Sequence, residues 1–151
     1  MTVADDDPYD LTRFVYAQID RDAFAHACDE IRAGKKRGHW IWFVFPQLKA
    51  LGRSETSQRF GISGTAEAAA YLAHPVLGPR LIAVTTLVLE GLETDPVALF
   101  GDVDALKVRS SLTLFSRIPQ ADPIFDSVLK RLYGGLADPL TCELLELELN
   151  P

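Results

Sequence analysis

Apolar residues recur at helical spacing along most of this 151-residue chain, between residues that start and stop helices. From Arg21 to Ala33, one stripe at i, i+3, i+4 and i+7 is formed by Phe24, Ala27, Cys28 and Ile31. Gly34 then supplies a residue type that commonly ends helices. This segment is therefore predicted to be an amphipathic helix with one face in the core.

Further segments carry comparable start and stop signals. Asp122-Pro123 and Asp138-Pro139 each place a capping carboxylate before a proline, which suits the first helical position because it has no N–H to leave unbonded. Helices are expected over about residues 63–73, 79–91, 102–118 with Asp102 as cap, 122–134 and 138–148. No alternation of strands and helices indicates a parallel sheet. The fold class is therefore predicted as all-α (mainly α), a compact single-domain bundle of about six to eight helices.

Two parts of the chain stand apart from this pattern. Residues 1–8 are expected to form an acidic N-terminal lead, and residues 9–151 a single helical domain without a linker. Residues 40–45 are aromatic and β-branched with no clean period, so a short helix and a short strand both remain open for them.

Composition restricts the class of protein. No apolar run approaches the ~20 residues that a bilayer span needs, and the acidic N-terminus is unlike a secretory signal, so a cytoplasmic protein without membrane contact is expected. The net charge of −6 disfavours binding to a nucleic acid duplex. Two cysteines and three scattered histidines show no metal-ligand spacing, and the familiar nucleotide, zinc and nucleophile motifs are absent. No metal or cofactor is therefore expected.

The densest positive charge of the chain runs into its densest aromatic cluster, in the sequence KKRGHWIWFVFPQ at residues 35–47. One interpretation is structural: the cations complement the C-terminus of the preceding helix, and the aromatic residues belong to the core. The other is a pocket in which an aromatic ring stacks on a planar ligand while a cation binds its anionic group. The candidates for that pocket are Lys36, His39, Trp40, Trp42 and Gln47.

A second polar feature lies in the predicted helix 102–118. At about 100° per residue, Lys107 and Ser111 fall within the apolar arc of this helix, one turn apart. An unpaired buried cation is costly, so Lys107 is expected either to extend to water or to line a polar pocket together with Ser111. A serine nucleophile activated by a lysine base is the least favoured alternative, because it needs a depressed lysine pKa and an oxyanion site.

Several spaced segments carry a family resemblance. They are RFVYAQ (13–18), GKKRGHWIWFVFPQLKALG (34–52), FGIS (60–63), EAAAYLAHPVLGPRL (67–81) and ALFGDVDALKVRSSLTLF (98–115). Together they resemble the DUF1810 family of bacterial proteins over about residues 8–147. The resemblance implies a mainly α-helical single domain and gives no activity. Its recurring polar positions match Lys36, His39, Gln47, Lys107, Ser110, Ser111 and Thr113 of this chain.

Two functions are therefore open. In the first, the two polar stretches meet around a cavity that binds a nucleotide- or ADP-ribose-like anionic ligand. If the protein is also an enzyme, hydrolysis of a glycosidic or phosphoester bond is the natural class, with His39 or a nearby carboxylate as acid or base. In the second, the protein is a non-catalytic interaction module without a deep polar cavity. Its tryptophans are core or form a docking patch, and Lys107 pairs with a structural carboxylate.

Overall fold

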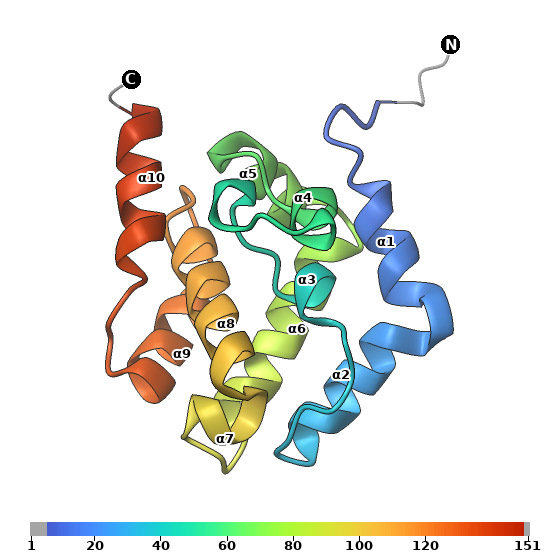
Figure 1. The fold of residues 1–151 in the computed structure, drawn as a ribbon, viewed down its shortest axis with the longest axis vertical. Coiled ribbons are helices and arrows are strands. Elements are labelled where there is room, and N and C mark those ends of the chain that lie inside the picture. Colours follow the sequence, from blue (N-terminus) through green and yellow to red (C-terminus); the bar gives the residue numbers. More distant parts are fainter. Residues whose placement is uncertain (1–5, 150–151) are drawn as a thin grey trace.

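The computed structural model describes residues 6–149, and helices form most of that part (Figure 1). The elements are α1 (Thr12–Ile19), the 3-10 turn η1 (Asp20–Asp22), α2 (Ala23–Arg32), α3 (Ile41–Val44), the 3-10 turn η2 (Lys49–Leu51), α4 (Glu55–Phe60), α5 (Thr65–Ala73), α6 (Leu77–Glu90), α7 (Pro96–Phe100), α8 (Asp102–Ser116), α9 (Ile124–Tyr133) and α10 (Pro139–Leu149). The predicted all-α class is confirmed. More helices occur in residues 6–149 than the six to eight expected. The additional helices include α3, α4 and α7, which contain only four to six residues each.

Segment 40–45, for which helix and strand were both open, contains the single-turn helix α3. Within residues 6–149, β pairing is confined to one isolated parallel bridge between Leu48 and Ile62. The acidic lead lies partly outside the described residues, but Asp7 has a clear structural role. Its carboxylate accepts hydrogen bonds from the backbone N–H groups of Leu11 and Thr12 at the start of α1, at 2.8 and 3.0 Å.

Local capping explains several helix boundaries. The carboxylate of Asp122 accepts from Ile124 N at 2.9 Å, and that of Asp138 accepts from Thr141 N at 2.9 Å, as their Asp-Pro sequences predict. The prediction that Asp102 caps α8 is wrong. Gly101 is the cap residue, because the chain there has a φ of +89°, which favours glycine, and Asp102 is the first helical residue.

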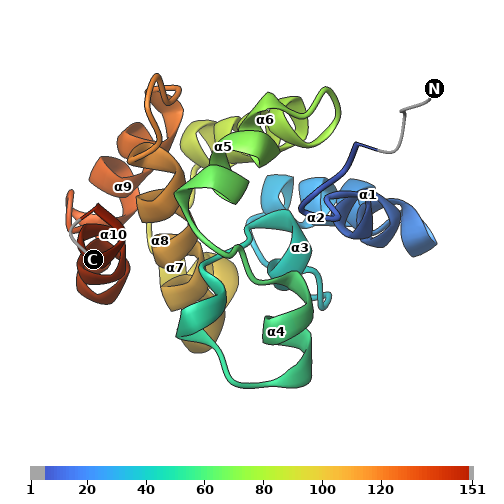
Figure 2. The same cartoon turned by 90° about the horizontal axis from the view of Figure 1, so that it is seen from above.

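The core lies where α6, α8 and α9 pack together, with α5 across one end of them (Figures 1 and 2). Phe14, Tyr71 and Phe115 are completely buried there, and the Tyr71 ring contacts both phenylalanines, with centroids 5.1 Å from Phe14 and 5.4 Å from Phe115. The pair α1 and α2 lies on the opposite side of the molecule from α10. Aromatic packing thus joins α1, α5 and α8, which are distant in sequence.

A polar cluster fixes α1 against α4 and α5. The guanidinium of Arg13 donates to Glu67 at 2.9 Å and to the backbone carbonyls of Arg59 and Gly61 at 2.7 and 2.9 Å. Gln18, which is buried, donates to the Phe43 carbonyl at 2.8 Å. Because these bonds connect α1 to the ends of α3 and α4, they set the position of the surface described next.

Candidate functional site

The loop between α2 and α3 is held by one carboxylate, that of Glu30. Its Oε1 accepts from the N–H groups of Arg37 at 2.7 Å and Gly38 at 2.9 Å, and from Trp40 Nε1 at 2.9 Å. Burial by itself would raise the pKa of Glu30, but these hydrogen bonds and the nearby Lys36 outweigh it and hold the pKa below its ordinary value. Glu30 is therefore a carboxylate near neutral pH, which disfavours it as a general acid.

The two polar stretches meet through another carboxylate, that of Asp104 on α8. Its Oδ2 lies 2.7 Å from Lys36 Nζ, and its Oδ1 lies 3.3 Å from Lys107 Nζ. Each lysine also lies over a tryptophan ring, with Lys36 Nζ 5.0 Å from the Trp40 centroid and Lys107 Nζ 4.8 Å from the Trp42 centroid. The lysines are therefore neutralised by Asp104 and packed on aromatic faces.

The tryptophans do not form an exposed patch. Trp40 is 2% exposed, and Trp42 is partly buried against the core. Lys107 lies over the Trp42 ring. The docking surface that an exposed tryptophan pair would provide is thus not formed by these two side chains.

The hydroxyl residues of α8 have different surroundings. Ser110 Oγ donates to the Leu106 carbonyl at 3.0 Å, and Thr113 Oγ1 donates to the Arg109 carbonyl at 2.8 Å. Thr113 Oγ1 also accepts from Asp138 N at 2.9 Å, which connects α8 to the start of α10. Ser111 is completely buried, and its Oγ has no hydrogen-bond partner among residues 6–149.

Gln47 and His39, the polar residues at the ends of the aromatic segment, point to different parts of the molecule. Gln47 is partly buried, and its backbone carbonyl accepts from Ile62 N at 2.9 Å beside the β-bridge. His39 is exposed and lines a groove on the side of α2 and α4. Of the residues singled out from the sequence, only His39 and Trp40 line this groove.

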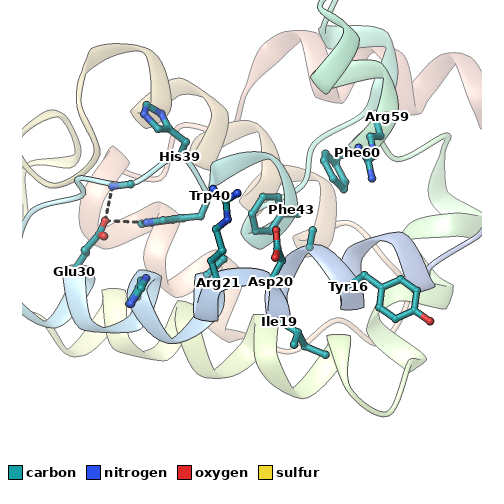
Figure 3. Close-up of a pocket in the computed structure, with 14 residues that line it drawn as sticks. Tyr16, Ile19, Asp20, Arg21, Glu30, His39, Trp40, Phe43, Arg59 and Phe60 are labelled. Atoms are coloured by element: carbon teal, nitrogen blue, oxygen red, sulfur yellow. Dashed lines mark hydrogen bonds between the residues drawn. The ribbon is translucent and has the colours of Figure 1, made fainter.

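The groove has a volume of about 770 Å³ and is built from α1, η1, α2, the loop before α3, α3 and α4 (Figure 3). Glu30 and His39 lie at one end, whereas Tyr16, Arg59 and Phe60 lie at the other. The remaining lining residues are Ala17, Ile19, Asp20, Arg21, Ala23, His26, Gly38, Trp40 and Phe43. The groove thus combines aromatic rings with both charged and neutral polar side chains.

The cations of the groove are available for a ligand. Neither Arg21 nor Arg59 forms an ion pair within residues 6–149, and both are exposed. His26 and His39 are also exposed. Arg21 and Asp22 adopt left-handed backbone conformations, with φ of 52° and 55°, which are costly for residues other than glycine. This turn directs the Arg21 side chain toward the wall that carries Trp40 and Phe43 (Figure 3).

Sequence reasoning missed most of the groove. Arg21 and Arg59 are 38 positions apart (59 − 21) and come together only because α1 packs against α4, so no local pattern pairs them. The role of Asp104 had a local signal, since a carboxylate three residues before a lysine on a helix can pair with it. The anchoring role of Glu30 had none, because its partners lie in a loop without periodicity.

The chain matches a family model over residues 8–145, and that family is described as "Protein of unknown function (DUF1810)". The chain belongs to the DUF1810 family. Its structure is similar to the crystal structure of the conserved hypothetical protein Rv1873 from Mycobacterium tuberculosis, with a TM-score of 0.89 and 48% sequence identity. The match covers 93% of this chain and 99% of that one. No curated protein matches the chain. The family resemblance inferred from the spaced segments is thereby confirmed.

Residues 6–149 also carry information about a membrane span and a metal site. No single helix there is both long and apolar enough to span a membrane, although α5 and α6 reach that composition as a pair bent by 88°. The same residues hold no group of three His, Cys, Asp or Glu side chains placed to bind a metal ion.

Proposed function

We propose that this protein binds a nucleotide- or ADP-ribose-like anionic ligand in the groove between α1, α2 and α4. The observation that carries the proposal is the pair of exposed arginines, Arg21 and Arg59, which have no ion-pair partner in residues 6–149 and line the same aromatic groove. In a chain of net charge −6, these are two guanidinium groups without an ion-pair partner, in a groove that also contains the carboxylates of Asp20 and Glu30. Guanidinium groups bind phosphate oxygens with two hydrogen bonds in a fixed geometry.

The dimensions and lining of the groove support a ligand of that size. Small-molecule sites typically have volumes of about 300–1,000 Å³, and this groove has about 770 Å³. Tyr16, which is 70% exposed, and Phe43, which is partly buried, offer aromatic surface for a planar base. The phosphates would lie against Arg21 and Arg59.

In this proposal the other residues singled out from the sequence do not contact the ligand but hold the segments that line the groove in position. Lys36, through Asp104 and Trp40, fixes the loop that carries His39. In the proposal Trp42, Lys107, Ser110, Ser111 and Thr113 hold α3 and α8 in place, and Gln47 fixes the chain entering η2. They therefore affect binding through the position of the loop.

A more specific version of this proposal is that the protein also hydrolyses the ligand that it binds. It would require a general acid or base, and His26 and His39 are the groove residues with an imidazole side chain. Incubation of the protein with ATP and with ADP-ribose, followed by chromatography of the products, tests it. Products that His39→Ala abolishes would support hydrolysis, and unchanged ligands would assign the groove to binding alone.

The binding proposal is tested by calorimetric titration with ATP, ADP-ribose and pyrophosphate. Arg21→Ala and Arg59→Ala should each weaken binding by about tenfold or more, because a hydrogen bond to a charged group contributes about 1.5–3 kcal/mol. Arg53→Ala removes an exposed arginine that does not line the groove and is the matched control. Binding that all three variants reduce equally would contradict the proposed location. No binding of any probe would favour the interaction module.

A further inference from the structure

The two oxygens of the Glu30 carboxylate have different surroundings. Oε1 accepts three hydrogen bonds, from Arg37 N, Gly38 N and Trp40 Nε1. Within residues 6–149, no hydrogen bond reaches Oε2, and Glu30 lines the groove. The carboxylate is therefore held in one orientation by one oxygen, and the other oxygen remains an acceptor without a partner.

The residue at position 38 keeps this acceptor accessible. A Cβ atom on Gly38 would lie 3.3 Å from Glu30 Oε2 and 3.1 Å from Trp40 Cδ1, which is tighter than most packed contacts. Gly38 also lines the groove. A side chain at this position would therefore crowd the free oxygen, and glycine avoids that contact.

The chemistry of a carboxylate oxygen restricts what can bind there. It accepts hydrogen bonds and repels phosphate, so it requires a donor on the ligand. The hydrogen bonds to Oε1 hold the pKa of Glu30 below its ordinary value, so the group stays charged near neutral pH. The exposed guanidinium groups of the groove belong to Arg21 and Arg59, and Arg59 lies at the end opposite Glu30 (Figure 3). A matching ligand has an anionic part and, at its other side, hydroxyl donors.

Building on the proposed function, we infer that Glu30 Oε2 accepts hydrogen bonds from the vicinal hydroxyls of a ribose in the ligand. The groove then selects ribose-containing phosphates over their deoxy analogues. Carboxylates bind ribose hydroxyls in the same way in dinucleotide-binding folds, which are unrelated to this all-α fold. The diol can belong to a nucleotide or to a simple sugar phosphate, and both use the same acceptor.

The test compares the dissociation constants of ATP, 2′,3′-dideoxy-ATP, ribose 5-phosphate and pyrophosphate by calorimetric titration. Loss of the hydroxyls should weaken binding to the unmodified protein by about tenfold to one hundredfold. Glu30→Gln can keep a carbonyl oxygen at the Oε1 position while placing an NH₂ group at the Oε2 position, so it should bind ATP and dideoxy-ATP equally. Asp29→Asn removes the charge of the neighbouring exposed carboxylate, which is not in the groove, and should retain the preference for ATP.

The outcomes separate this inference from the proposed function. Equal binding of ATP and dideoxy-ATP to the unmodified protein would overturn the role of Glu30 and leave the anion groove standing, whether or not Glu30→Gln folds. Ribose 5-phosphate that binds as tightly as ATP would support the diol contact and assign the groove to sugar phosphates. Absence of binding by all four probes would overturn both the inference and the proposed function.

Discussion

Replacing Asp104 by alanine should destabilise the protein, because this carboxylate neutralises two lysines at once. Lys36 Nζ is 2.7 Å away, and the Lys36 side chain is only 8% exposed. Lys107 Nζ is 3.3 Å away, and its side chain is 16% exposed. Asp104→Ala would leave both ammonium groups next to each other without a counter-charge.

The magnitude follows from the geometry. At 2.7 Å, an effective dielectric constant of about 20 gives a Coulomb attraction of about 6 kcal/mol, much of which offsets the desolvation of the two groups. Breaking a buried pair from one side typically costs about 3–5 kcal/mol. Lys36 keeps its hydrogen bond to the Gly38 carbonyl and its contact with Trp40, and Lys107 can turn to water, so we expect about 3 kcal/mol. For a chain of this length, that corresponds to a decrease in Tm of about 6–12 °C.

Urea denaturation followed by circular dichroism measures the change in the free energy of unfolding. Asp102→Ala is the control, because Asp102 is an exposed residue in the same first turn and should lose only about 0.3–1 kcal/mol of helix-dipole stabilisation. The double variant Asp104→Ala/Lys36→Met should recover at least about 1 kcal/mol relative to Asp104→Ala, since it removes the more buried of the two unpaired charges. A loss for Asp104→Ala no larger than that for Asp102→Ala would falsify the reasoning.

Two further predictions concern Glu30 and Thr113. The folded-state pKa of Glu30 lies below its ordinary value of 4.5, so its stabilisation is present above that pH and is lost as the pH falls through the folded-state pKa. Denaturation at about pH 7 and pH 4 should therefore show a smaller loss of stability in Glu30→Gln than in the unmodified protein, and equal losses would contradict the assigned shift. Thr113→Val should cost about 1–2 kcal/mol in the same assay, because Asp138 N loses its acceptor. Thr85→Val is the matched control, because the Thr85 hydroxyl is completely buried and only donates to the Leu81 carbonyl. This variant should change the free energy of unfolding by less than about 0.5 kcal/mol. Similar losses in the two variants would show that the bond to Asp138 N contributes little.

Helices with strong local signals were predictable from the sequence. The Asp-Pro pairs at residues 122–123 and 138–139 precede α9 and α10, and Gly91 follows the end of α6. The helices missed were α1, α4 and α7, of eight, six and five residues. Short helices have few periods in which an apolar stripe can be recognised, and their stability comes mainly from tertiary packing.

The candidate site was predictable only in part. The aromatic and basic segment drew attention to His39 and Trp40, and both residues line the groove. Lys36 and Lys107 drew attention for their charge, and the structure places both against Asp104 and a tryptophan ring. The sequence shows that these lysines are present. The distance of Lys36 from a carboxylate on α8 depends on how the helices pack, so it could not be predicted.

The sequence by itself determined the helical class, the starts of α9 and α10 and the resemblance to DUF1810, because capping groups, prolines and apolar periods act within a few residues of one another. Tertiary structure alone decided that one groove contains both Arg21 and Arg59 and that Lys36 is neutralised by Asp104. Those arrangements require α1 to pack on α4 and the loop before α3 to meet α8. The relative position of distant helices is set by burial of the shared core, which no local pattern encodes.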